Sequence, residues 1–414
     1  MKESLLFTRR EFLRAGGILA VGAAIPAFLV RTAEAAADAH GAIRGFADGR
    51  ILVVVQLAGG NDGLNTLVPV DDDAYHRVRP RIGLKRDKLL MLDDGRTGLN
   101  PRLAGLKELL DDGRAAVVEG VGYPNPNRSH FRSMEIWHTA TDSNRYSDTG
   151  WIGRYLDAQC GGEGEPVAAV AVGGQRPQAF AGRRGLGVAM QDPGSFGWTE
   201  GPGPARVAAF RDLNRPGAEG GSNLDFVRKV AADAVLGSDR VRAAARAYRG
   251  GVEYPRDPFG QGLQTVAKMI AGGLQTRIYH VTLGGFDTHA NQSGTHDNLL
   301  ERLGNGLLAF QRDLDAQGNA DRVVTMTFSE FGRRVAENAS GGTDHGTAAP
   351  MFVIGSPVRP GFLGARPSLT DLDNGDLKHT TDFRAVYATV LEQWLRAPAA
   401  GVLGRDFAPV GRLV

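Results

Sequence analysis

The chain alternates between short, continuously apolar runs and longer segments in which apolar residues recur at helical spacing. The apolar runs, rich in β-branched residues, lie at 51–57, 115–121, 167–172, 278–283, 322–328 and 351–354. Segments with helical character lie at 103–110, 151–159, 222–248, 260–276, 299–314 and 382–395. Continuous apolar runs are typical of strands buried on both faces of a sheet. The alternation therefore predicts an α/β fold, a three-layer sandwich with helices on both faces of a mostly parallel central sheet.

The organisation of the chain predicts one large domain rather than several. No internal repeat or clean linker interrupts 51–414, which we interpret as a single α/β domain preceded by a linker over 36–50. The stretch near 173–221 is rich in Gly, Pro and Arg without a sustained period, and we expect a loop-rich insertion there. In sheets of this kind ligands bind beyond the carboxyl ends of the strands. Candidate chemistry is therefore sought at those ends.

The N-terminus predicts export. The pair Arg9-Arg10 precedes a weakly apolar run over 15–30, and Ala33-Glu34-Ala35 follows as a small-residue cleavage site. These features are typical of a twin-arginine signal peptide, here over 1–35. The run is shorter than the roughly 20 residues that span a membrane. We expect a periplasmic or secreted protein, carried by the twin-arginine translocase and without a stable membrane anchor.

The amino-acid composition excludes several classes of protein. Hydrophobic residues make up 42% of the chain and charged residues 23%, which excludes a disordered or fibrous protein. The net charge of +2 argues against a nucleic-acid partner, because such proteins carry a basic excess. Cys160 is the single cysteine, so neither an intrachain disulfide nor a cysteine zinc site is expected. We interpret it as a buried or incidental thiol.

Three of the predicted strands are followed by clusters of Asp, Asn, His and Gly. These clusters contribute the candidate metal ligands Asp62, Asp287, His289, Asp344 and His345. Carboxylates with imidazoles suit Zn²⁺ or Mn²⁺ and, with fewer histidines, Mg²⁺ or Ca²⁺. Two other interpretations stay open, since Asp and Asn beside Gly are ordinary turn residues and an Asp–His pair can simply close a loop. Three clusters at the ends of three buried strands favour a divalent metal site.

The segment after the 115–121 run holds a candidate nucleophile. Ser129 is either the N-cap of a following helix or a hydroxyl whose attack a metal activates. Arg128 and Arg333 are either solvated or hold an anionic group through two hydrogen bonds. With Asn61, which lies in the first cluster, these two arginines are the candidate substrate-binding residues.

Six segments, in one order along the chain, resemble the bacterial family named domain of unknown function 1501. They are LAGGNDGLNTLVP (57–69), NRSHFRSMEIWHTA (127–140), GGFDTHANQ (284–292), FSEFGR (328–333), GTDHG (342–346) and TTDFRAVYATVLEQWL (380–395). That family in turn resembles the alkaline phosphatase and sulfatase superfamily, whose members have an α/β sandwich with Asp and His ligands at strand ends. The resemblance implies an alkaline phosphatase-like core. It also implies that Asp62, Asp344 and His345 bind one metal.

The same resemblance assigns further residues. Asp287 would belong to a second metal site, with His289 or Asn291 in place of its histidine. His379, which is followed by Thr380, would be the last histidine ligand. Ser129 would be the nucleophile.

These expectations combine into one leading function and one alternative. The leading hypothesis is an exported metal-dependent hydrolase of phosphate or sulfate esters, acting on a small molecule or on a polymer such as a cell-surface polysaccharide. The alternative is a non-catalytic extracytoplasmic binding or assembly protein on the same scaffold.

Overall fold

The computed structural model describes residues 48–159, 167–173, 175–183, 187–192, 204–214, 237–238 and 240–414. The predicted signal peptide (1–35), most of the linker (36–50), Cys160 and most of the predicted helix at 222–248 lie outside these residues. None of the helices in the described part is long and apolar enough to cross a membrane.

Within the described residues the central sheet has nine strands, which join segments from both halves of the chain. Eight of them lie in the order β11 (Gly361–Leu363), β5 (Ala115–Gly122), β10 (Ala349–Ile354), β9 (Val323–Phe328), β1 (Ile51–Ala58), β8 (Ile278–Gly284), β6 (Ala169–Val172) and β7 (Gly187–Met190). The ninth, β14 (Thr381–Asp382), also pairs with β5. β10 is antiparallel to both of its neighbours, and the other pairings are parallel. The predicted α/β fold with a mostly parallel central sheet is confirmed.

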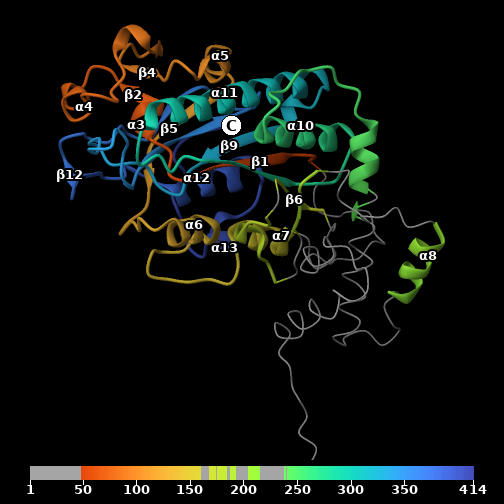
Figure 1. Cartoon of the computed structure of the whole chain (residues 1–414). Helices are drawn as coiled ribbons and strands as arrows, with labels where there is room; N and C mark the ends of the chain where they lie inside the picture. Colours follow the sequence, from red (N-terminus) through yellow and green to blue (C-terminus); the bar gives the residue numbers. More distant parts are fainter. Residues whose placement is uncertain are drawn as a thin grey trace, which may run out of the picture.

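Helices cover both faces of the sheet (Figure 1). One face carries α5 (Ala104–Asp111), α10 (Pro258–Ala271) and α11 (Gln292–Ala316). The other carries α6 (His130–Thr139), α7 (Trp151–Gln159), α12 (Phe383–Thr389), which continues as the π-helical turn η5 (Val390–Trp394), and α13 (Ala399–Leu403). Alternate residues of β1 enter the two separate hydrophobic cores: Val53 and Val55 face one, Leu52 and Val54 the other. A strand buried on both faces needs this continuous apolar sequence.

Smaller elements surround this sandwich. They are α3 (Gly63–Thr66), β2 (Leu67–Pro69), α4 (Asp73–Val78), η2 (Arg86–Lys88), β3 (Leu90–Met91), β4 (Thr97–Leu99), η3 (Gln178–Phe180), α8 (Pro204–Leu213), η4 (Ala320–Arg322), β12 (Leu372–Asp373) and β13 (Asp376–Leu377). Most are too short to show a hydrophobic period. Both β7 and α8 lie inside the stretch 173–221, so its described parts include regular structure.

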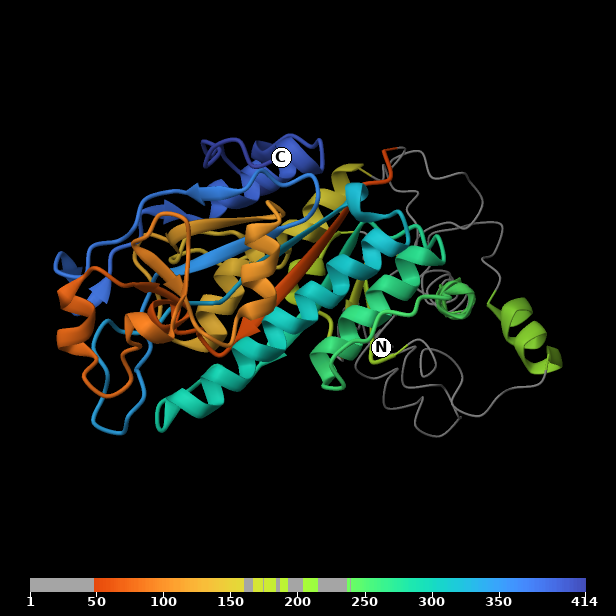
Figure 2. The same cartoon turned by 90° about the horizontal axis from the view of Figure 1, so that it is seen from above.

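The direction of β10 decides which loops share one edge of the sheet. The parallel strands β1, β5, β8 and β9 all end at the same edge, and β10 begins there because it runs the opposite way. The segments that follow those four strands and the segment that precedes β10 are therefore neighbours. Figure 2 shows this sheet from above, with the long α11 crossing it.

Candidate metal centre

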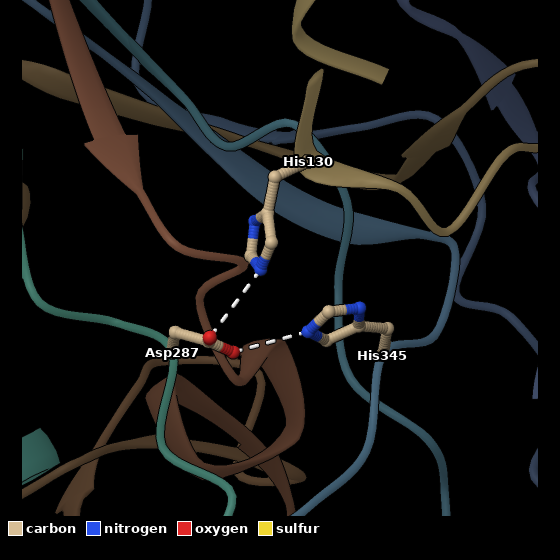
Figure 3. A group of neighbouring side chains, drawn as sticks. All are labelled: His130, Asp287 and His345. Carbon is tan, nitrogen blue, oxygen red and sulfur yellow. Dashed lines mark hydrogen bonds and ion pairs between the residues drawn. The ribbon is translucent and has the colours of Figure 1, made fainter. Parts of the chain in front are cut away.

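Three histidines and one aspartate meet at this edge of the sheet. His130 is the first residue of α6, after β5; Asp287 and His289 follow β8; and His345 lies just before β10. Ligand atoms of His130, Asp287 and His345 all lie within 4.8 Å of one another, and the side chains point toward a common centre (Figure 3). His130 and His345 are 215 positions apart in the chain, and the strand order brings them together here.

The shortest distances in the cluster join atoms that accept hydrogen bonds or bind metals. Oδ1 of Asp287 lies 3.0 Å from Nε2 of His345 and 3.0 Å from Nε2 of His289. The two Nε2 atoms of His289 and His345 are 2.9 Å apart, and Nε2 of His130 is 3.4 Å from Oδ2 of Asp287. The side chains of Asp287 and His289 are 47% and 45% exposed, so a ligand from solvent can reach them.

Partners on the other ring nitrogens orient all three imidazoles. Nδ1 of His345 lies 2.8 Å from the carbonyl oxygen of Arg128, which can only accept, so Nδ1 carries the proton. Nδ1 of His130 lies 2.9 Å from a carboxylate oxygen of Glu330, and Nδ1 of His289 lies 3.3 Å from Oδ1 of Asp344. We assign the same tautomer to each, with the Nε2 lone pair directed into the cluster. Histidines that bind metals are held in this way.

The donor set fits a divalent cation. Lone pairs 2.9–3.0 Å apart repel one another unless a proton or a cation lies between them. Two ligands of a tetrahedral zinc, each bonded at 2.0–2.1 Å, lie roughly 3.3 Å apart, a few tenths of an ångström more than here. Three imidazoles with one carboxylate suit Zn²⁺ or Mn²⁺ better than Mg²⁺ or Ca²⁺, which prefer oxygen.

Negative charge around the cluster is only partly balanced. Glu330 is fully buried; its Oε1 accepts from the backbone N–H of Gly59 at 2.8 Å as well as from His130, and its Oε2 has no hydrogen-bond partner. Among the described residues, Arg333 is the one arginine bonded to Asp287. A buried carboxylate without a cation is costly, so a positive ion beside His130 would stabilise the site.

Arg333 holds the loops of the site rather than facing solvent. Its buried guanidinium donates to Oδ1 of Asp287 at 2.7 Å, to the carbonyl of Gly60 at 2.7 Å and to the carbonyl of Thr343 at 2.9 Å. Burial acts to raise the pKa of Asp287, whereas the hydrogen bond and the positive charge of Arg333 act to lower it, and the pKa lies well below its usual range. Asp287 is therefore ionised and ready to bind a cation.

Two glycines allow the loops to approach one another. Gly59 has a φ of +118°, and a Cβ there would lie 2.5 Å from the backbone nitrogen of Asp287. A Cβ on Gly342 would collide with the backbone of His289. Both positions need glycine because a side chain would push apart the loops that carry the ligands.

Comparison with known proteins places the chain in a family. Residues 115–411 match the family model described as "Protein of unknown function (DUF1501)". The chain belongs to the DUF1501 family. No curated protein matches its sequence.

Solved structures that are similar to the DUF1501 chain share little sequence with it. A protein in the alkaline phosphatase superfamily from Vibrio parahaemolyticus is 12% identical, with a TM-score of 0.39 over 91% of this chain and 76% of that one. The lipoteichoic acid synthase LtaP from Listeria monocytogenes is 10% identical, with a TM-score of 0.36 over 85% and 79%. The C-terminal periplasmic domain of EcEptC from Escherichia coli, solved in complex with Zn, is 10% identical, with a TM-score of 0.37 over 74% and 73%.

Asp62 of the DUF1501 chain lies outside the cluster of ligand atoms. Its buried carboxylate is 2.6 Å from Nη1 of Arg79 and 2.5 Å from Nε2 of Gln292, and it caps α3 by accepting from the N–H groups of Leu64 and Asn65. Burial acts to raise the pKa of Asp62, and the charge of Arg79 lowers it below the usual value. The expectation that Asp62 shares a metal with Asp344 and His345 is not supported by this placement, because its oxygens are already occupied.

The other residues predicted for the site also differ in whether they lie close to the cluster or away from it. Asp344 contacts Nδ1 of His289, on the side of the ring that faces away from the cluster. His379 is partly buried beside Gly122 at the end of β5, outside the group of ligand atoms found among the described residues. Asn61 is buried, and its amide oxygen accepts from Thr66 and lies 2.9 Å from Nε2 of His296. Neither Asn61 nor the buried Arg333 is open to a substrate.

Ser129 and Arg128 of the DUF1501 chain are exposed and directly precede His130. Ser129 occupies the N-cap position of α6, but its hydroxyl makes no capping hydrogen bond and the residue is exposed. The side chain of Arg128 is 40% exposed and forms an ion pair with Asp376, while its carbonyl orients His345.

Sequence reasoning missed two residues of the site, His130 and Glu330. His130 directly follows Ser129, and Glu330 follows the end of β9 by two residues, so both lay inside segments that were singled out. The signal available in the sequence was a glutamate and a histidine that follow two different predicted strands. Nothing in the linear pattern pairs them.

Proposed function

We propose that this protein is an exported, metal-dependent hydrolase of phosphate or sulfate esters. The observation that carries the proposal is the close approach of Nε2 of His289, Nε2 of His345 and Oδ1 of Asp287, at 2.9–3.0 Å, in a site open to solvent. These three residues and His130 would hold one divalent ion, with Zn²⁺ or Mn²⁺ favoured. When bound, such an ion supplies Lewis-acid stabilisation of a developing oxyanion and lowers the pKa of water.

The residues of the chain have distinct parts in this proposal. Ser129 presents a hydroxyl that makes no capping bond directly before the ligand His130, and it is the proposed nucleophile, with water as the alternative. Arg128, whose carbonyl contacts His345, is the proposed cation that orients the anionic ester. Glu330 and Asp344 keep the imidazoles of His130 and His289 in the tautomer that a metal requires.

The proposed export rests on the N-terminal sequence. Arg9-Arg10, the apolar run and Ala33-Glu34-Ala35 support delivery to the periplasm or the medium by the twin-arginine translocase. That pathway is associated with proteins that fold and load a cofactor before they cross the membrane, which suits a metal bound by residues from distant loops.

The proposal is tested on the purified mature chain by elemental analysis and by a screen of aryl phosphates, phosphodiesters and sulfates. We expect about one transition metal per chain and hydrolysis of at least one ester. Asp287→Asn should lose both, because it removes the carboxylate at the centre of the cluster. The matched control Asp406→Asn changes an exposed aspartate elsewhere and should keep both.

Two results would overturn the proposal. Hydrolysis and metal content that survive Asp287→Asn would show that the cluster is not the site. A metal-free protein of unchanged stability and without esterase activity would favour the non-catalytic binding or assembly protein instead.

A further inference from the structure

A cavity whose wall carries several charged side chains lies at the opposite end of α6 from His130. It has a volume of about 230 Å³. Its walls are the loop between α6 and α7, the start of α12 and the turn after α13, lined by Ala140, Thr141, Asp142, Arg145, Ser147, Thr149, Arg154, Arg384, Leu403, Gly404, Arg405 and Phe407. At 1.5 Å per residue, α6 separates this cavity from His130 by roughly 15 Å. The cavity is therefore distinct from the metal cluster.

Positive charge dominates the wall of the cavity. Four arginines line it, against the single carboxylate of Asp142. Oδ1 of Asp142 accepts from Arg384 at 2.5 Å and from Arg405 at 3.0 Å. Arg384 is also paired with both oxygens of Asp382, which lies outside the wall. The two acids form ion pairs with Arg384 and Arg405. Among the described residues, the other two arginines of the wall, Arg145 and Arg154, form no ion pair.

Arg154 is one of the two arginines of the cavity wall that form no ion pair with a described residue. It is partly buried, and its donors bond neutral groups: Nε donates to the carbonyl of Val402 at 2.5 Å, Nη2 to the carbonyl of Thr139 at 2.7 Å, and Nη1 to the carbonyl and the hydroxyl of Thr149 at 2.7 and 3.4 Å. Within the described part of the chain, no carboxylate lies within ion-pair distance of its guanidinium. Burial lowers the pKa of Arg154 to about 10. A cation held away from water without a counter-ion is unfavourable, and an anion in the cavity would offset this cost.

Arg145 is the second of these two arginines, and a ligand from solvent can reach its side chain. It is exposed at the mouth of the cavity, and among the described residues its side chain has no ion pair. In the same cavity wall, the guanidinium groups of Arg384 and Arg405 lie over the ring of Phe407, 4.9 and 4.8 Å from its centre. Stacking on an aromatic face holds an arginine in place and lowers the entropy lost when a ligand binds.

We propose that this cavity binds a small molecule through a phosphate or sulfate group. Guanidinium groups match the oxygens of such groups through paired hydrogen bonds. Arg145 and Arg405 would contact the anion directly. The partly buried Arg154 would attract the anion through its positive charge. This site is independent of the proposed hydrolase activity.

The test is titration calorimetry of the full mature chain with inorganic phosphate, at constant ionic strength and after treatment with a chelator. Arg145→Gln removes an exposed guanidinium with no ion pair to lose, and we expect it to weaken phosphate binding about tenfold or more. Arg405→Gln should weaken it similarly. The matched control Arg302→Gln, an exposed arginine on α11, should leave the affinity unchanged.

The variant Asp287→Asn separates this proposal from the proposed function. Phosphate binding that persists in Asp287→Asn supports the cavity, whatever becomes of the metal and the activity. If Arg145→Gln and Arg405→Gln both bind phosphate as the unchanged chain does, or if Asp287→Asn abolishes binding, the proposal is wrong. Tighter binding of glycerol 3-phosphate than of inorganic phosphate would identify an ester as the occupant, and equal binding would identify the free ion.

Discussion

Glu330 and His130 form a hydrogen-bonded pair in which Oε1 of the acid lies 2.9 Å from Nδ1 of the imidazole. The acid follows β9 and the imidazole begins α6, and the side chain of Glu330 is fully buried. Glu330 therefore orients the proposed metal ligand His130 from a buried position that a substrate does not reach.

Glu330→Gln tests this orientation. Glutamine keeps the shape of the side chain but replaces a charged acceptor with a neutral amide, so His130 should become a weaker ligand. We expect metal affinity to fall about 10–100-fold while the protein stays folded. Competition with a chromogenic chelator measures the affinity, and circular dichroism measures the fold. Unchanged affinity in a folded variant would exclude His130 from the site.

Asp344→Asn should have a smaller effect than Asp287→Asn. Asp344 is exposed, and its carboxylate contacts Nδ1 of His289 and the amide of Asn338. Asp287, in contrast, lies within 3.0 Å of two imidazole nitrogens. An asparagine oxygen can still accept from His289, so we expect a loss of metal affinity of about tenfold or less. The same chelator competition compares the two variants. An equal and complete loss in both would make Asp344 a direct ligand.

Asp62→Asn should act on stability rather than on metal binding. It breaks a buried ion pair with Arg79 in which neither side chain is exposed. Leaving Arg79 without its partner should lower the free energy of unfolding by about 3–5 kcal/mol. Urea denaturation measures the loss, and elemental analysis at low temperature measures the metal. If Asp62→Asn is folded and stable but contains no metal, Asp62 is a metal ligand after all.

Acid should destabilise the protein through two histidines in its core. Burial lowers the pKa of His138 to about 4 and, with the nearby His138, lowers that of His280 to about 3. Below the unfolded pKa of about 6.5 the unfolded chain binds protons that the folded chain excludes, so stability is complete above that pH and falls as the pH drops toward 4. The slope should approach 1.4 kcal/mol per pH unit for each histidine.

Urea denaturation between pH 7 and pH 4.5 measures that slope. His280→Asn should remove the contribution of one histidine, whereas the control His76→Gln, at an exposed histidine on α4, should not change the slope. Parallel pH profiles for the unchanged chain and His280→Asn would show that His280 titrates normally in the folded state.

Much of the fold follows from local sequence. Apolar runs predicted β1, β5, β8 and β9 to within one residue at each end, because a strand covered on both faces has few polar positions to obscure it. The short strands β2, β3 and β4 were not predicted, since two or three residues cannot establish a period.

The amino-acid sequence by itself determined that polar clusters follow the buried strands, and parallel strands that end together bring such clusters to one edge. Only the tertiary structure decided which members of each cluster face a common centre. Asp62 turns inward because Arg79 and Gln292, 17 and 230 residues away, supply its hydrogen bonds. His345 joins His130 and Asp287 because β10 runs antiparallel and starts where its neighbours end. Strand direction and buried charge pairing depend on contacts between distant parts of the chain, and no local pattern encodes them.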